Sequence, residues 1–209
     1  IPVDREGNVL YNNIIHSDSR SGEESRSILE TFSMEHIYRT TGNRIDPHFS
    51  LPKILWLKNH YPQIYENTAY FLNTKDYIAY KLTGNLGITD YSDASLTCML
   101  DIESRNWALD LLTDVGIHRD KLPQILKSQD IVGGLSKEVA SILGLIEGIP
   151  VVAGGGDGAS ATKGAGVVKE GMAYNYIGSS SWISTMSQVP VIDDRARTFQ
   201  FFDLDGKNY

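Results

Sequence analysis

The sequence has a single cysteine, few basic residues and no long apolar run. One thiol, Cys98, can form neither an intrachain disulfide nor a cysteine-based zinc site, so a reducing cytoplasm is the simplest compartment. A membrane-spanning helix needs about 18 or more consecutive apolar residues. No such run is present, and we therefore expect no membrane partner.

Basic residues are outnumbered, with 19 Lys and Arg against 26 Asp and Glu, which gives a formal net charge of −7. This acidity argues against a nucleic-acid partner. It also constrains any phosphate site, which must use backbone N–H groups and a metal ion instead of a field of basic side chains. The chain has 209 residues, of which 41% are hydrophobic, and this suits one large domain or one domain with part of another.

Several catalytic motifs are missing as well. The pattern Gly-x4-Gly-Lys-Ser/Thr does not occur, which excludes a P-loop enzyme. The segment Gly178-x-Ser180-x-Trp182 lacks the second glycine of a nucleophile elbow. The histidines show no i, i+4 pair of the kind that binds a metal on one helix face, so we predict no metal site from them. They are His16, His36, His48, His60 and His118.

Apolar spacing, caps and turn residues predict the secondary structure. Helices are expected at residues 25–40, after Pro52, and at residues 74–82, 107–115, 137–143 and 159–165. Strands are expected at residues 9–15, 69–72, 131–135, 149–153, 173–177, 182–186 and 198–204. Helices dominate before about residue 148 and strands after about residue 172. We therefore expect a domain boundary at residues 167–171, which separates residues 1–168 from residues 169–209.

The last residues contain the hairpin signal Asp205-Gly206, and the strand that should pair with residues 198–204 would follow the end of the sequence. A hairpin cut in half leaves an open edge that invites aggregation. Together with a first residue other than Met, this predicts a piece of a longer protein.

The segment with the richest chemistry is a strand, a glycine loop and a helix over residues 151–166. Three glycines, Gly154–Gly156, precede Asp157 and allow a substrate to approach the main chain closely. Asp157 would follow the carboxyl end of a buried strand, where open α/β sheets bind ligands, and near a helix N-terminus that favours its charge. Such a carboxylate can accept the proton of a hydroxyl that attacks an electrophile. The structural alternative is an aspartate that only caps the following helix.

A second loop, Gly178-Ser179-Ser180, lies about twenty residues further on, between two expected strands. Its N–H and hydroxyl donors suit the terminal phosphates of a nucleotide, and the alternative is a plain hairpin turn. The pattern Gly154-x-Gly156-x-x-Ala159 also matches a dinucleotide fingerprint, which leaves a nicotinamide dehydrogenase as a rival. That motif requires an acidic residue at the end of the next strand, where this sequence has Gly178 and Ser179.

Five segments in order resemble the FGGY carbohydrate kinases. The segments are residues 14–20 (I-x-W-x-D-x-R in the family), 50–56 (P-K-x-x-W), 76–94 (D-Y-x5-L-T-G-x-x-x-T-D-x-S-x-A), 151–166 (the G-G-G-D loop) and 177–180 (G-T-S), with Asp101 and Trp107 at the usual interval. They extend over nearly the whole chain, and their overall similarity favours xylulose kinase.

The resemblance implies an α/β, actin-like and ribonuclease H-like ATPase fold. Residues 1–168 would be the remainder of the N-terminal sugar-binding domain, and residues 169–209 the start of the C-terminal nucleotide-binding domain. The N-terminal phosphate loop of the family would precede Ile1, its adenosine site would follow Tyr209, and this piece would be inactive alone. The resemblance implies sugar and ATP as ligands, Mg²⁺ as cofactor and a cytoplasmic enzyme, and it leaves a homodimer open.

By the same resemblance, Asp157 would be the catalytic base, Gly158 would touch the sugar, and Gly178, Ser179 and Ser180 would face the ATP phosphates. The expected reaction is ATP-dependent phosphorylation of xylulose to xylulose 5-phosphate. Two departures bear on this reading. His16 stands where Trp is common, and Gly158 stands where xylulose kinases have Asn and glycerol kinases Gln. A gluconate, ribulose or glycerol-type kinase and a non-catalytic sugar-binding module therefore stay open.

Overall fold

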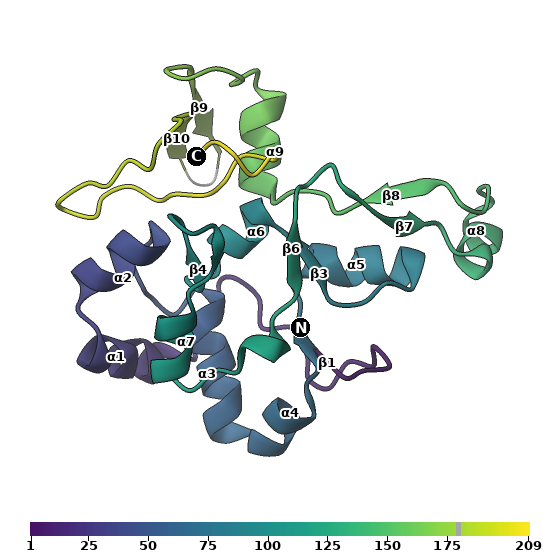
Figure 1. Cartoon of the computed structure of the whole chain (residues 1–209), viewed down its shortest axis with the longest axis horizontal. Helices are drawn as coiled ribbons and strands as arrows, with labels where there is room; N and C mark the ends of the chain where they lie inside the picture. The colour runs from purple at the N-terminus through teal and green to yellow at the C-terminus, as the bar shows by residue number, and fades with distance from the viewer. Residues whose placement is uncertain (179–180) are drawn as a thin grey trace.

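The computed structural model describes residues 1–178 and 181–209, with helices and short strands alternating along the chain (Figure 1). The helices are α1 (Gly22–Thr31), α2 (Met34–Thr41), α3 (Ser50–His60), α4 (Pro62–Asn67), α5 (Thr74–Thr83), α6 (Tyr91–Ser95), α7 (Leu109–Asp114), the short 3-10 helix η1 (Arg119–Lys121), α8 (Lys137–Leu143) and α9 (Asp157–Gly164). The strands are β1 (Pro2–Val3), β2 (Tyr70–Phe71), β3 (Ile88–Asp90), β4 (Leu100–Asp101), β5 (Asn106–Trp107), β6 (Gln124–Leu126), β7 (Ile131–Gly134), β8 (Pro150–Val152), β9 (Ala173–Ile177) and β10 (Ser181–Thr185). No helix among these residues has both the length and the apolarity to cross a bilayer.

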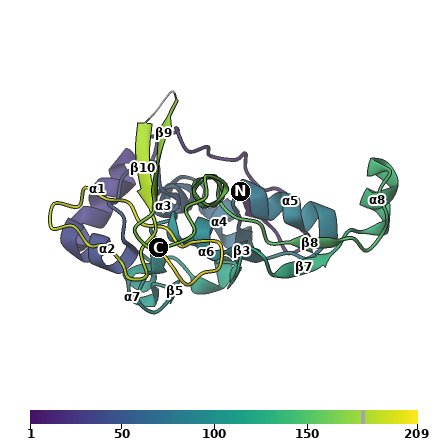
Figure 2. The ribbon, with the colours of Figure 1, turned by 90° about the horizontal axis from the view of Figure 1, so that it is seen from above.

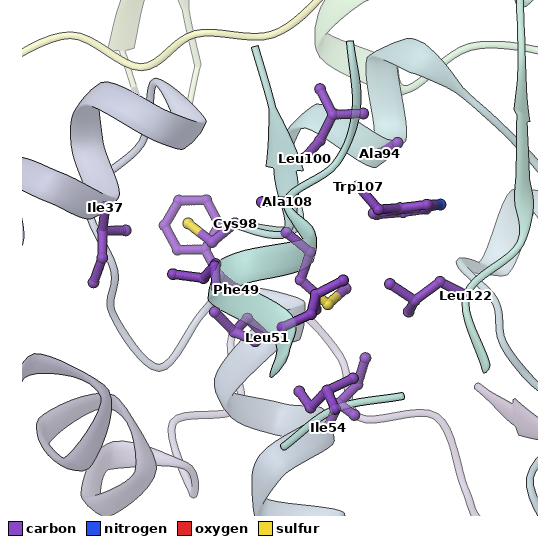
Figure 3. Packing of buried hydrophobic residues seen from close by; sticks show 14 of the residues in the cluster. Ile37, Phe49, Leu51, Ile54, Ala94, Cys98, Leu100, Trp107, Ala108 and Leu122 are labelled. Atoms are coloured by element: carbon purple, nitrogen blue, oxygen red, sulfur yellow. The ribbon is translucent and has the colours of Figure 1, made fainter. Parts of the chain in front are cut away.

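The hydrophobic core lies among α2, α3, α6, α7 and the β4–β5 pair (Figure 3). Leu51 and Ile54 of α3 point into it with 0% and 6% of their surface exposed, and Ile37 of α2 is fully buried. Trp107 fills the side next to β6, where its Nε1 donates a hydrogen bond to the carbonyl oxygen of Pro123 at 2.9 Å. Burial of such side chains stabilises the fold by about 1.5–3 kcal/mol each. The core thus forms a rigid base beneath the polar residues of β3 and α6.

The described strands pair only two by two. The parallel pair β3–β6 ends at Asp90, directly before α6, and so places a carboxylate at the carboxyl end of a strand. The antiparallel pair β7–β8 forms an arm that carries α8 away from the core, as both views show (Figures 1 and 2). The expected strand at residues 149–153 is present as β8, but the expectation that it is buried is wrong, because Ile149 and Val152 are 40% and 46% exposed.

Three other expectations are also wrong. The helix expected at residues 25–40 is two helices, because the chain leaves α1 at Phe32 and Ser33 starts α2, with Ser33 Oγ accepting a hydrogen bond from the His36 N–H at 3.1 Å. Residues 9–15 form no strand and contribute only an isolated bridge through Val9. Residues 198–204 form no strand either, since this segment lies across the core and its main chain bonds to side chains there, as Phe202 N–H does to Ser95 Oγ.

Other expectations are confirmed. Helix α8 spans the expected residues, α5 ends at Gly84 with a positive φ of 80°, and a helix begins just before Pro52. Strands β9 and β10 form the antiparallel hairpin expected after residue 172, with β10 starting one residue earlier than expected. This hairpin projects beside α9 (Figure 2).

Candidate active site

Asp157 is the first residue of α9 and follows the glycine loop that leaves β8. Gly154 has a φ of 72°, a left-handed conformation that favours glycine and turns the chain toward the helix. The cap position of α9 belongs to Gly156, so Asp157 does not occupy the place that the capping alternative gave it. Its side chain is exposed, and its Oδ1 accepts a hydrogen bond from the N–H of Gly158 at 2.8 Å.

The glycine loop is held by groups from other elements. The N–H of Gly156 donates to Ser92 Oγ on α6 at 2.8 Å, and the N–H of Gly154 donates to the carbonyl oxygen of Ser128 at 2.9 Å. Lys75 Nζ on α5 donates to the carbonyl oxygen of Ala153 at 3.1 Å. The loop is therefore held at Ala153, Gly154 and Gly156, and the position of Asp157 depends on α5 and α6.

Lys75 lies in a group of carboxylates next to this loop. Its Nζ is 2.7 Å from Asp76 Oδ1, 3.1 Å from Asp90 Oδ1 and 3.7 Å from Asp93 Oδ2. Burial opposes the charge of Lys75, but these carboxylates outweigh burial and raise its pKa. Lys75 thus stays charged and compensates carboxylates that are almost completely buried.

Asp90 links this group to the loop through a serine. Its Oδ2 accepts hydrogen bonds from the Ser92 N–H at 3.0 Å, from Ser92 Oγ at 2.5 Å and from Ser128 Oγ at 2.6 Å. The Ser92 hydroxyl donates its one proton to Asp90, and its oxygen is therefore free to accept the hydrogen bond from the Gly156 N–H.

Asp93 also lies beside the loop, with 19% of its side chain exposed. Burial raises the pKa of Asp93 to about 7, with Lys75 opposing the rise and the charges of Asp76, Asp90 and Asp157 adding to it. Asp93 and Asp157 therefore lie near enough to affect one another.

Both carboxylates face a cavity of about 760 Å³. Its lining includes Gly155, Asp157, Asp93, Lys75, His16 and His48. A volume of this size fits a small polar ligand with room to spare. Among the described residues, no three His, Cys, Asp or Glu side chains are placed so that they could hold a metal ion together.

Lys53 of α3 holds another part of the lining of this cavity in place. Its Nζ donates to the carbonyl oxygens of Ile15 at 2.7 Å, His16 at 3.1 Å and His48 at 3.0 Å, so all three of its protons are used. The His16 and His48 rings lie 5.3 Å apart between centroids. Lys53 and His16 belong to two separate segments of the family resemblance, residues 50–56 and 14–20, and the structure shows that these segments meet here.

The other predicted site residues lie away from this cavity. Gly158 is buried, and a Cβ built on it would lie 3.5 Å from the Trp182 ring, so its contact with a sugar stays a prediction. Gly178 is exposed in the bend after β9 and does not line the cavity. Ser179 and Ser180 lie outside the described residues.

Sequence reasoning gave no role to Lys75, Ser92 and Asp93. Two of them belong to the D-Y … T-D-x-S-x-A segment, and Lys75 directly precedes that segment. No sequence signal separates them from other polar residues, because the carboxylates gather around Lys75 only in the folded chain.

Residues 1–164 match the N-terminal domain of the FGGY family of carbohydrate kinases. The chain belongs to this family. It is 36% identical over 206 residues to a xylulose kinase of Bacillus subtilis, and the match covers 99% of this chain and 41% of that protein. The chain thus spans about two fifths of the length of this relative.

Solved structures agree with the family assignment. A gluconate kinase from Lactobacillus acidophilus superposes with a TM-score of 0.92 at 26% identity, over 100% of this chain and 42% of that one. A Plasmodium falciparum glycerol kinase solved with ADP superposes with a TM-score of 0.80 at 28% identity, over 88% of this chain and 37% of that one. The expected actin-like α/β ATPase fold is confirmed.

Proposed function

We propose that this chain contributes the sugar-binding half of an ATP-dependent sugar kinase, with Asp157 as general base. The observation that carries this proposal is an exposed carboxylate that faces a cavity from the start of α9, directly after a loop held by hydrogen bonds. In the reaction, the sugar hydroxyl oxygen attacks the γ-phosphorus, the bond to the β-phosphate oxygen breaks, and the hydroxyl proton passes to Asp157. The products are a sugar phosphate and ADP.

The rest of the site would position this proton transfer. Ser92 and Lys75 hold the loop so that Asp157 meets a bound hydroxyl, and well-oriented reactants gain several powers of ten in rate. The phosphates of ATP are proposed to lie at Gly178, Ser179 and Ser180. The described residues gather no set of side chains that could hold a metal ion, so Mg²⁺ is proposed to enter with the bound nucleotide.

Xylulose is the first substrate to test, because a xylulose kinase matches nearly the whole chain. Gluconate, ribulose and glycerol follow, the first and last because kinases of these substrates share the fold. Release of ADP by the full-length protein, measured with each sugar, tests the proposal, and an absence of turnover with all of them would contradict it. A cytoplasmic location and a homodimer remain predictions.

Asp157→Asn in the full-length protein tests the general base. The variant should retain sugar binding and lose about 10²–10⁴-fold in kcat, the usual contribution of general-base catalysis. Asp110→Asn on the exposed side of α7 is the matched control and should turn over normally. A kcat near the wild-type value in Asp157→Asn would count decisively against this role.

We also propose that residues 1–209 act only within a longer protein, with the domain boundary near residue 168. The share of the relatives that is covered supports this, and so does the arm, where four apolar side chains are 53–77% exposed. These side chains are Ile142, Leu143, Leu145 and Ile146. Patches of this kind mark contact surfaces in folded proteins. ATP-dependent turnover by the isolated 209 residues would contradict the proposal.

A further inference from the structure

Asp93 carries a carboxylate that lacks hydrogen-bond donors. It is the third residue of α6, and its side chain lines the same cavity as Asp157. Within the described residues, neither of its carboxylate oxygens accepts a hydrogen bond. Its nearest cation, Lys75 Nζ, is 3.7 Å away, which is beyond hydrogen-bond distance.

The neighbouring carboxylates differ from Asp93 in this respect. Asp90 Oδ2 accepts three hydrogen bonds, and Asp76 accepts from Lys75 Nζ at 2.7 Å and from the Asn73 N–H at 3.0 Å. These two acids are fully used by the protein. The Asp93 oxygens are not among the fully buried atoms without a partner, so they stay open to the cavity, where a ligand hydroxyl can donate to them. Asp93 is therefore the acid in this group that is open to a ligand.

Asp93 also lies directly against the glycine loop. A Cβ built on Gly156 would come within 2.6 Å of Asp93 Oδ1. Only a glycine at this position allows the carboxylate to approach so closely, and Gly156 is the residue before Asp157. A small ligand whose hydroxyl meets Asp157 therefore has Asp93 within reach of another of its hydroxyls.

We propose that Asp93 binds a second hydroxyl of the sugar, next to the one that Asp157 deprotonates, and so selects substrates with neutral hydroxyls on neighbouring carbons at the reacting end. The proposal rests on the proposed kinase function and names its substrate class. Two carboxylates at this end of the cavity favour hydroxyl donors and disfavour an anionic group. A sugar acid must therefore bind with its carboxylate directed elsewhere.

The first experiment is a coupling measurement on the full-length protein. The sugar with the highest kcat/KM is compared with its monodeoxy analogues, in wild type and in Asp93→Ala. One analogue should lose about 10–100-fold in kcat/KM, the range for one hydrogen bond to a charged group. Asp93→Ala should lose a similar factor with the parent sugar and no more than about threefold further with that analogue. An equal loss for the parent and all analogues would overturn the proposal.

Asp93→Asn keeps the shape of the side chain, so it guards against a folding failure, and Asp101→Asn, outside the cavity, is the control.

A second experiment measures the pH dependence of KM. Burial raises the pKa of Asp93 to about 7, so the ionised acceptor is lost as the pH falls from 8 to 6. The KM of wild type for the sugar should rise over this interval, and the rise should be absent in Asp93→Asn. The groups that face Asp93 are Lys75 and Asp76 of α5, Asp90 of β3 and Asp157 of α9.

His16 and His48 also line the cavity, and histidines commonly titrate in this range. They are unchanged in Asp93→Asn, so a pH dependence of KM that persists in this variant would overturn the assignment to Asp93. If the full-length protein phosphorylates none of the sugars, the kinase function fails. The sugars and their deoxy analogues are then titrated by calorimetry without ATP, and the same coupling must appear in the Kd for the Asp93 proposal to stand.

Discussion

Ser92→Ala is the sharpest test of how the glycine loop before Asp157 is held. The hydroxyl of Ser92 joins the Gly156 N–H to Asp90 Oδ2, and the residue is only 1% exposed, so water has little access to replace it. Loss of the hydroxyl leaves the buried N–H without its partner, which costs about 1–3 kcal/mol. Asp90 Oδ2 keeps its bonds from Ser128 Oγ and the Ser92 N–H, so its own loss lies near the low end of about 1.5–3 kcal/mol.

Together these losses amount to about 3 kcal/mol, which corresponds to a fall of roughly 6–12 °C in the thermal midpoint of a domain of this size. A displacement of the loop by about 1 Å would also lower kcat about 10²-fold. Both quantities are measured on the full-length protein, by thermal melting and by release of ADP.

Ser25→Ala is the matched control for this measurement. Ser25 is also buried, but its Oγ donates only locally, to the carbonyl oxygen of Ser21 directly before α1, at 3.2 Å. This variant should lose about 1 kcal/mol of stability and keep its kcat. If Ser92→Ala melts like Ser25→Ala and turns over within twofold of wild type, the loop does not depend on Ser92 and the reasoning is wrong.

Three further variants test the same site. Gly156 has a backbone conformation that alanine can adopt (φ −58°, ψ 152°), so the loss of turnover expected for Gly156→Ala comes from the clash of the new methyl group with Asp93 alone. Gly164→Ala, which has open space around it, is the control and should be neutral or slightly stabilising. Equal kcat values in the two variants would contradict this. Lys75→Met should lower the free energy of unfolding by about 3–5 kcal/mol at pH 8, because the buried carboxylates lose the cation that compensates them. The loss should be smaller at pH 6, since without Lys75 these carboxylates take up protons more readily in the folded protein than in the unfolded one. A difference in thermal midpoint between variant and wild type that does not change with pH would refute this. Lys53→Met should raise KM for the sugar more than it lowers kcat, because the segments that carry His16 and His48 lose their anchor, and an unchanged KM would show that they do not reach the substrate.

The parts of the fold that sequence predicted well are those governed by local chemistry. Helix α8 has a Ser136 cap, whose Oγ accepts from the Val139 N–H, and ends at Gly144, which has a positive φ. Strand β9 likewise matches its expected bounds. Local patterns failed where contacts from distant residues decide, as for residues 198–204, whose Gln200 N–H bonds to the side chain of Asn43.

The candidate site shows the same division. The glycine loop and Asp157 could be found from sequence because glycines, a strand and a helix start are adjacent in the chain. Asp93 and Ser92 could not, since they are more than 60 residues away from the loop that they contact. No periodicity reports that a carboxylate is buried, and only the fold shows which of several acids lacks a donor.

The charges of the cavity also determine where a phosphate can be bound. Lys53 and Lys75 are the Lys and Arg residues that line it within the described part of the chain. Lys53 spends its three protons on backbone carbonyl oxygens, and Lys75 is surrounded by carboxylates. Neither has an N–H free to donate to an incoming γ-phosphate. In the proposed reaction, the transferred phosphoryl group would therefore be stabilised by backbone N–H groups, a metal ion or residues outside this cavity, which is also what we predict from the net charge of −7. The role we propose for this cavity is accordingly to hold the sugar and accept its proton, while groups outside it stabilise the transferred phosphate.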